Sequence, residues 1–230
     1  MGMSVLQGAF IAIAVAGATA LAWSGTAHVG YRSAGVEIEH ELHVPNRAAR
    51  SGSCGVERWA VKTGTDADAQ RVDLANPVAA TIDALRSLPA PAMPSSNARV
   101  QPAETTLYAL DATLVAYRLE GDSDYRMVIR DAAGNTMFAE IPDPACVAAS
   151  SPFAPAIRKT RNAFDARLGA SSRYKTVNIP VHVSGIGFFD SSNGLAGVAP
   201  NAIELHPVLG IVFKPSASRK APAHDKANLR

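Results

Sequence analysis

Charged residues are scarce in this chain of 230 residues, because Asp, Glu, Lys and Arg make up only 18% of it. A typical soluble domain has about 25%. Hydrophobic residues make up 47%, which excludes a chain that is disordered throughout. The 17 glycines and 15 prolines are too few for a collagen-like or low-complexity chain. A formal net charge of +2 excludes a polycation that coats nucleic acid.

Several enzyme motifs are also missing. The chain has no Gly-x-Ser-x-Gly, and neither of its two cysteines lies beside a candidate base. It has no Walker-type loop, and Gly185-Ile186-Gly187 lacks the third glycine of a dinucleotide fingerprint. These absences count against nucleophilic hydrolysis and against nucleotide or dinucleotide binding.

The first thirty residues carry no Asp, Glu, Lys or Arg, and Val5 to Trp23 are almost wholly apolar or small. A segment without a polar face belongs in a bilayer, at least transiently. Small residues around Ala20 and Ala27 favour cleavage, whereas a length of about 19 residues also suits a retained anchor. We therefore expect residues 1–27 to be a signal peptide or a membrane anchor. The protein would then be exported, periplasmic or extracellular, and held at the inner membrane only if the segment is retained.

Composition divides the rest of the chain into four parts. We expect residues 28–53 to be a polar linker and residues 54–104 to be an N-terminal extension with a short helix. Residues 105–213 carry strand patterns, and residues 214–230 form a basic tail that we expect to be disordered.

Two features are expected in the extension. Asn76 and Pro77 predict the start of a helix whose apolar face holds Val78, Ile82 and Leu85. Cys54 and Cys146 predict a disulfide, because an even pair of cysteines outside the cytosol usually bonds.

Residues 105–213 predict a mainly β fold with one or two helices. Three strands are followed by one helix and two further strands, and the predicted ranges are Thr105–Arg118, Asp124–Arg130, Thr136–Ile141, Ser151–Gly169 for the helix, Val177–Val183 and Ala202–Phe213. Pro180 predicts that the fourth strand lies at an edge or a bulge. The order matches a five-stranded OB-like Greek-key barrel (β-β-β-α-β-β) with an N-terminal extension.

Acidic residues cluster near the second and third predicted strands. Asp122 and Asp124 lie two residues apart, and Glu140 ends the third strand. Residues two apart on a strand share a face, so these carboxylates can together attract a hard divalent cation such as Ca²⁺ or Mg²⁺. The alternative is an acidic turn between two strands that binds nothing.

A second candidate pair lies on the last predicted strand. Glu204 and His206 are two residues apart on its polar face, and such a pair can orient a catalytic base or bind a metal. The alternative is a histidine that is hydrogen-bonded within a polar face. Spacing alone does not place His182, on the neighbouring strand, relative to this pair.

The acidic stretches resemble the staphylococcal nuclease-like OB proteins, whose first hairpin reads Asp-Gly-Asp-Thr and whose later strand ends in Asp-Thr-Pro-Glu. The matching stretches here are Glu120 to Asp124 and Glu140 to Asp143. The resemblance implies a divalent-metal-dependent phosphodiesterase, with Asp122, Asp124 and Glu140 on the metal and with His206 and Glu204 as base. That family has an arginine on the third strand, and Thr136–Ala139 supply none.

Residues 54–213 resemble more closely an uncharacterised family of secreted bacterial proteins. The resemblance lies in the runs Cys54–Thr63, Glu140–Cys146 and Gly197–Val208. It implies export and an OB-like barrel but no reaction. Its members often carry histidines where this chain has Arg126 and Asn193, so a site that depends on those histidines would be incomplete here.

We therefore predict an exported OB-like module with a binding or structural role and an unknown ligand: a small molecule, a polysaccharide, a nucleic acid or a protein. The alternatives are a divalent-metal-dependent phosphodiesterase or nuclease and a membrane-anchored subunit of an envelope complex. Whether the protein is an enzyme stays open, and a divalent cation is the only cofactor that the sequence suggests.

Overall fold

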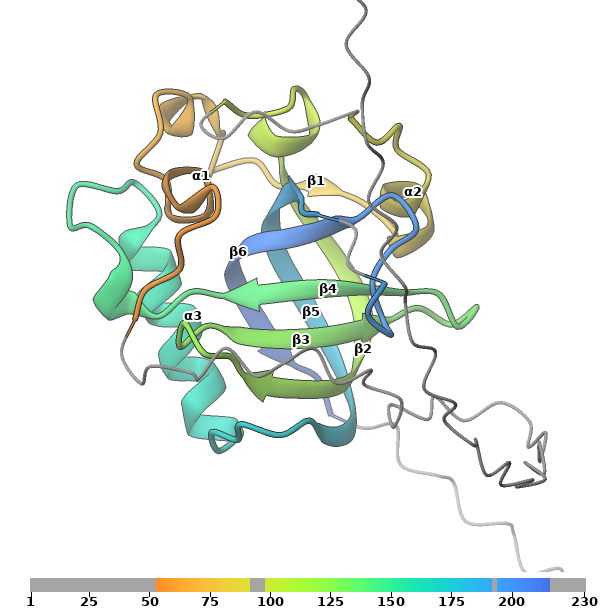
Figure 1. Cartoon of the computed structure of the whole chain (residues 1–230). Coiled ribbons are helices and arrows are strands. Elements are labelled where there is room, and N and C mark those ends of the chain that lie inside the picture. Colours follow the sequence, from red (N-terminus) through yellow and green to blue (C-terminus); the bar gives the residue numbers. More distant parts are fainter. Residues whose placement is uncertain (1–52, 92–97, 192–193, 216–230) are drawn as a thin grey trace, which may run out of the picture. The chain divides into compact units, whose positions relative to one another are not determined.

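The computed structural model describes residues 53–91, 98–191 and 194–215 (Figure 1). The predicted signal peptide or anchor, almost all of the linker, most of the basic tail and Asn193 therefore lie outside the described residues. Within these three ranges, no helix has both the length and the apolar character that crossing a membrane requires.

The described residues form three α-helices and six strands. In chain order they are α1 (Trp59–Thr63), β1 (Val78–Ala79), α2 (Ile82–Arg86), β2 (Leu107–Leu119), β3 (Tyr125–Arg130), β4 (Thr136–Ile141), α3 (Ala154–Arg167), β5 (Lys175–Phe189) and β6 (Ile203–Phe213). Short 3₁₀ helices cover Ala69–Arg71, Ala103–Thr105 and Pro144–Cys146. The predicted order of three strands, one helix and two strands is present from β2 to β6.

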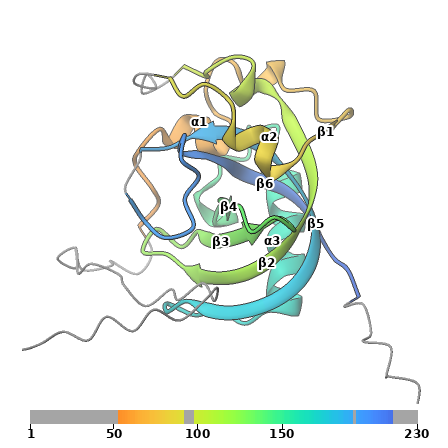
Figure 2. The ribbon, with the colours of Figure 1, turned by 90° about the vertical axis from the view of Figure 1, so that its right-hand side faces the viewer.

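All six strands belong to one sheet, in the order β1-β2-β3-β4-β6-β5. An additional pairing of β2 with β5 closes the five longer strands into a ring, and β1 adds to β2 in parallel. Figure 2 shows these strands curving around a common interior, with α3 behind them. Neighbours in the ring are antiparallel except β4 and β6, which are parallel and pair only at Phe138↔Glu204 and Ala139↔Leu205.

Alternation along the strands directs one set of apolar side chains into the interior of the ring. Met127 and Ile129 of β3 belong to the main core, with Leu205 of β6 and Phe164 of α3. The Phe164 ring lies 4.5 Å from that of Tyr125, between ring centroids. Each large side chain buried in this way contributes about 1.5–3 kcal/mol to folding. The residues between them on β3, β4 and β6 face outward, because side chains on a strand alternate between its two faces.

The helix predicted from Asn76 is wrong in its start. Val78 and Ala79 are extended and pair with β2, and Val78 is exposed. The helix α2 begins at Ile82 instead. Its N-cap is Thr81, whose side chain accepts a hydrogen bond from the N–H of Ala84. Backbone pairing with the long strand β2 therefore outweighs the local signal of Asn76 and Pro77.

Of the two positions predicted for Pro180, an edge strand is wrong, because β5 pairs with β2 on one side and β6 on the other. A bulge or irregularity does lie next to it, since the register of β2 and β5 shifts after the pair Leu114↔Ile179. Pro180 lies one residue beyond the last β5–β6 pair, Val181↔Phe213. Its carbonyl accepts the N–H of Lys214, and the N–H that proline lacks would face the same side, so the missing hydrogen bond falls at the end of the β5–β6 ladder.

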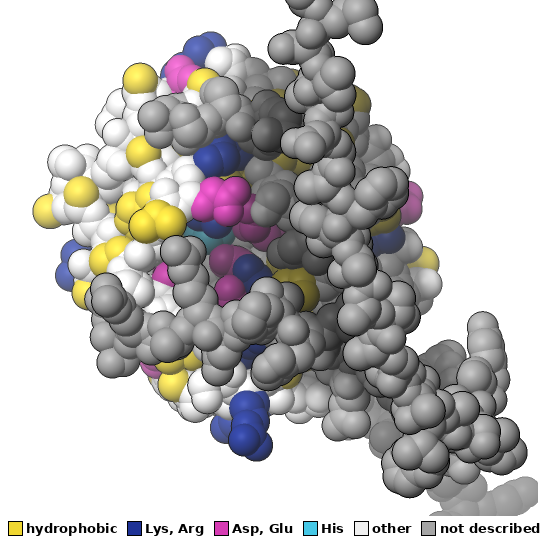
Figure 3. Space-filling model, in the orientation of Figure 1, with side chains coloured by type: hydrophobic (Ala, Val, Ile, Leu, Met, Phe, Trp, Pro, Cys, Tyr) yellow, Lys and Arg dark blue, Asp and Glu magenta, His cyan; other side chains and the backbone are white. Residues whose placement is uncertain are grey.

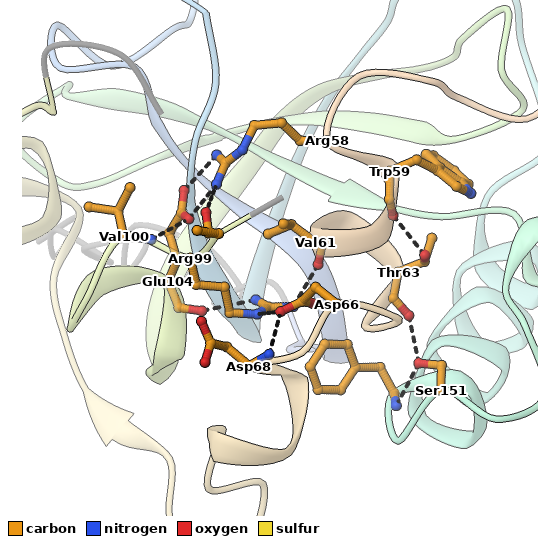
Figure 4. Close-up of polar contacts among 12 residues, drawn as sticks. Arg58, Trp59, Val61, Thr63, Asp66, Asp68, Arg99, Val100, Glu104 and Ser151 are labelled. Atoms are coloured by element: carbon orange, nitrogen blue, oxygen red, sulfur yellow. Dashed lines mark hydrogen bonds and ion pairs between the residues drawn. The ribbon is translucent and has the colours of Figure 1, made fainter. Parts of the chain in front are cut away.

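The N-terminal arm (residues 53–91) is fixed to the ring by a buried ion pair (Figure 4). Glu104 is fully buried, and its carboxylate accepts two hydrogen bonds from Arg58, at 2.6 and 2.8 Å. It also accepts the backbone N–H groups of Val100 and Phe189, at 2.7 and 2.8 Å. Four donors thus satisfy one carboxylate, which is the condition under which a buried charge is tolerated.

A second ion pair continues this network. The side chain of Arg99 donates to both carboxylate oxygens of Asp66, at 3.0 and 2.7 Å, and to the carbonyls of Val61 and Glu104. Arg99 therefore joins α1 to the segment that carries Glu104. The predicted disulfide is present as well, because Cys54 is bonded to Cys146 across 92 residues of sequence.

We predict that Glu104→Gln strongly destabilises the fold. The substitution leaves the buried Arg58 guanidinium without its counter-ion, which costs about 3–5 kcal/mol. Asp68→Asn is the control, because it removes an ion pair with an exposed Arg71 and should cost less than about 1 kcal/mol. Urea unfolding of both variants measures the difference, and equal losses would contradict this account.

Candidate functional site

The register of the ring lines up four outward side chains across four strands. Arg118 of β2 pairs with Arg126 of β3, and Arg126 pairs with Glu140 of β4. The parallel pairing of β4 with β6 continues this line to His206. We call these four residues, Arg118, Arg126, Glu140 and His206, the polar row.

The next outward row is apolar on β3 and β4, whereas on β6 it holds Glu204, opposite Phe138. Val128 and Phe138 are buried beneath the segment between β5 and β6, with Leu195 and Val198 packed against them. Gly197 allows this close approach, because a Cβ atom there would lie 3.0 Å from Val128 and 3.1 Å from Phe138. Only the polar row and its surroundings are therefore left as a site on this face.

His206 lies at the centre of the site and is 1% exposed. Its Nδ1 atom lies 3.1 Å from a carboxylate oxygen of Glu204 and 3.2 Å from one of Glu140. Its Nε2 atom faces Asp124 Oδ2 across 3.6 Å. Three carboxylates thus surround one imidazole, from the start of β3, the end of β4 and β6.

Asp124 enters this group from the turn between β2 and β3. One of its oxygens, Oδ1, accepts the backbone N–H of Asp143 at 2.9 Å. Its other oxygen, Oδ2, is buried and has no hydrogen-bond partner, and the same is true of His206 Nε2. The two unpartnered atoms face each other at a distance too long for a hydrogen bond.

Arg126 neutralises the other end of the polar row. It donates to Glu140 at 2.6 Å and lies 3.0 Å from Glu120, which also accepts from Arg118 at 2.8 Å. These residues are largely buried. Ion pairs between neighbouring positive and negative side chains therefore compensate for the hydration that each charge loses on burial.

The N-terminal arm supplies a further cation. Lys62 of α1 lies 5.0 Å from the centroid of the Phe188 ring, and that ring lies 5.6 Å from the His206 ring. Burial lowers the pKa of Lys62, but the charges of Glu204, Asp190 and Glu140 outweigh it and raise the pKa above its ordinary value. On the face seen in Figure 3, histidine, acidic and basic side chains gather in one place.

The carboxylates around His206 hold its proton. Burial alone would lower the pKa of His206, but its contacts with Asp124, Glu140 and Glu204 raise it well above the ordinary value. Burial, together with the charge of Glu140, raises the pKa of Glu204 to about 7. Burial also raises the pKa of Asp124.

Glu140 differs from its neighbours. Burial works against its ionised form, but Arg126 and His206 outweigh burial and hold the pKa of Glu140 well below its usual range. In return, Glu140 and Glu120 raise the pKa of Arg126 in spite of its burial. Glu140 is therefore the fixed negative charge of the site, whereas Glu204 changes its charge close to neutral pH.

The structure brings four of the five predicted site residues together: Asp124, Glu140, Glu204 and His206. Asp122 is not one of the three candidate metal ligands, and its Oδ1 atom accepts the backbone N–H of Asp124 at 3.2 Å. His182 lies apart from this group, because it is exposed on β5 and contacts Asp111 at 2.6 Å.

Sequence reasoning missed Arg126 and Lys62. The predicted strands held a signal for Arg126, because a hairpin through the turn at Asp131–Asn135 places Arg126 opposite Glu140. The third strand lacks an arginine, as noted above, and the structure places one beside it on the second. Nothing local indicates Lys62, which approaches the site only through the contacts of the arm.

Asp124, Glu140 and His206 together could hold a metal ion. Each offers one ligand atom, and these atoms lie within 4.8 Å of one another. Two ligands at about 2.1 Å from a tetrahedral ion lie about 3.4 Å apart. The longest of these separations would therefore shorten by up to about 1.4 Å on binding.

A scan against protein-family models finds no model that matches this chain, and a search of curated proteins finds no matching sequence. The geometry of the described residues is therefore the basis of the functional argument.

We predict that Arg126→Gln lowers the free energy of unfolding by about 3–5 kcal/mol, because Glu140 and Glu120 lose a buried counter-ion. Arg130→Gln is a matched control on the same strand, since Arg130 forms no ion pair with the described part of the chain. It should change the stability by less than about 0.5 kcal/mol. Chemical unfolding measures both, and a small effect of Arg126→Gln would contradict the role given to it.

Proposed function

We propose that the chain is a ligand-binding module of OB-like architecture, and that Asp124, Glu140 and His206 hold a divalent cation on its binding face. The ring of strands supports the architecture. The ring order β2-β3-β4-β6-β5 and the helix between β4 and β5 are consistent with the five-stranded Greek-key barrel that we propose. Such barrels bind ligands on the face of the second and third strands, which here are β3 and β4.

The proposal of a cation site rests on one observation. Asp124 Oδ2 and His206 Nε2 are both buried, both without a hydrogen-bond partner, and 3.6 Å apart. A buried polar atom without a hydrogen bond costs about 1–3 kcal/mol, and the ion pair that these two atoms form while His206 is protonated is longer than a hydrogen bond. An ion between them would satisfy both, and Glu140 supplies a third ligand from β4.

The ligand set favours a transition-metal ion over Ca²⁺ or Mg²⁺. The sequence suggested carboxylates alone, which suit the harder ions. His206 adds an imidazole nitrogen, and a mixture of imidazole and carboxylate suits Zn²⁺ or Mn²⁺. Three protein ligands leave a position open for water or for a ligand atom.

A binding role fits these residues better than the alternative of a phosphodiesterase. Arg126 is fully engaged with Glu120 and Glu140, so it is not free to neutralise a transition state. Asp122 is not among the candidate ligands. The Cys54–Cys146 disulfide supports the proposal that the module is exported.

Calorimetric titration of the full chain with Mn²⁺ and with Zn²⁺ tests the cation site. We expect one ion per chain and tighter binding than for Ca²⁺ or Mg²⁺. His206→Gln and Asp124→Asn each remove one ligand and should weaken binding at least about tenfold.

Matched controls come from residues close by. His182→Gln changes the exposed histidine, and Asp122→Asn keeps the oxygen that accepts the Asp124 N–H. Both should bind the ion as the unaltered chain does. A titration without heat, confirmed by equilibrium dialysis, would eliminate the cation site, and equal losses in all four variants would eliminate this ligand set.

A further inference from the structure

The Cys54–Cys146 disulfide lies within two residue contacts of the proposed cation ligand Asp124. Asp143 provides the first connection, because its backbone N–H donates to Asp124 Oδ1 at 2.9 Å. Asp143 also begins the 3₁₀ helix Pro144–Cys146, where its side chain accepts the N–H of Ala145 and its carbonyl accepts the N–H of Cys146. The disulfide therefore fixes the short helix whose first residue orients Asp124.

The arm supplies a second connection to the same carboxylate. Gly55 follows Cys54 and packs between the Trp59 ring and Asp122, since a Cβ atom on Gly55 would lie 2.5 Å from the ring and 3.3 Å from Asp122 Oδ2. Asp122 in turn accepts the backbone N–H of Asp124. The Trp59 indole N–H donates to the carbonyl of Cys146 at 3.3 Å, which joins the two connections.

The other two candidate ligands do not depend on the disulfide in this way. Glu140 lies in the β3–β4 ladder, where it pairs with Arg126, and His206 lies in β6 between Leu205 and Val208, which pair with Gly187 and Gly185 of β5. The arm itself stays attached through Arg58 and Glu104, which are independent of Cys54. Loss of the disulfide therefore acts on one ligand, Asp124, and leaves the ring in place.

We infer that the Cys54–Cys146 disulfide positions Asp124 for the cation, so that cation affinity and the oxidation state of the disulfide are coupled. This inference rests on the proposed cation site. Reduction by a dithiol breaks the S–S bond, delivers two electrons and two protons to the cysteines, and converts the dithiol into a disulfide. By linkage, the factor by which reduction weakens cation binding is also the factor by which the cation favours the oxidised form.

The first test compares two substitutions at Asp143, both of which keep the disulfide. Its φ of −67° is the value that proline imposes, so Asp143→Pro removes the N–H that donates to Asp124 and keeps this φ. Asp143→Ala keeps that N–H and loses only the side chain. We expect the Kd for Mn²⁺ to rise about tenfold in Asp143→Pro, the range for a lost outer-shell contact, and to stay within about twofold in Asp143→Ala.

The second test removes the disulfide. The double substitution Cys54→Ser and Cys146→Ser should raise the Kd for Mn²⁺ by about tenfold as well, because it frees the same helix. Mn²⁺ is the probe because the thiols of a reduced protein would bind Zn²⁺ on their own. Circular dichroism checks that the serine variant is folded. If it is not folded, the comparison of Asp143→Pro with Asp143→Ala tests the coupling.

The third test measures the coupling from the other side. In a glutathione redox buffer, saturating Mn²⁺ should shift the ratio of disulfide to dithiol toward the disulfide by about the same tenfold factor. His206→Gln keeps the disulfide but lacks the ligand, so Mn²⁺ should not shift its ratio. A role of the disulfide in stability alone would not produce this dependence.

The outcomes separate the two proposals. If Mn²⁺ binds the unaltered chain but neither Asp143→Pro nor the serine variant weakens binding, the coupling is overturned and the cation site stands. If Mn²⁺ does not bind the unaltered chain, both are overturned. Equal losses in Asp143→Pro and Asp143→Ala would also overturn the inference, because the backbone N–H would then not be the connection.

Discussion

Buried charge needs a partner of opposite sign, and this constraint explains most of the outer face of β3, β4 and β6. Glu140 is 3% exposed and would be unstable there alone. Arg126 lies on one side of it and His206 on the other, since the register of three strands places both there. The carboxylates of Asp124 and Glu204 then hold the proton of His206 and complete the balance. Each of these side chains is tolerated only because the ladders hold its partners in place.

The N-terminal arm lies beside one end of the polar row. Its helix α1 contacts β6, and Lys62 of α1 is close enough for the charges of Glu204 and Glu140 to raise its pKa. The arm is held by Glu104, whose carboxylate joins Arg58 to the backbone of β5 at Phe189 and to that of Val100. Contacts outside the site thus hold the arm, and with it the Lys62 ammonium, close to the carboxylates of Glu204 and Glu140.

The sequence was informative where a pattern is local. Alternation predicted the strands from β2 to β6 and placed Glu204 and His206 on one polar face, and an even pair of cysteines predicted the disulfide. Spacing could not decide between Asp122 and Asp124, because a turn follows no strand periodicity, and Ser123 has a φ of 71°. The contacts of Asp124 with β6 and of Glu104 with the arm join residues far apart in the chain. They follow from the closure of the ring, which no local signal encodes.

The site also lies where the ring is joined most weakly. Only two residue pairs join β4 and β6, whereas β5 and β6 pair along most of their length. Glu140 and His206 lie immediately beyond that short ladder, and Asp124 reaches across from the start of β3. Attraction between these side chains therefore continues the contact between β4 and β6 beyond their last paired residues. A cation held by the same three residues would bind only the closed ring, and so would stabilise its closure in proportion to its affinity. Ligand binding and the integrity of the fold would then depend on the same few atoms, which gives a physical reason for keeping so many charges out of water.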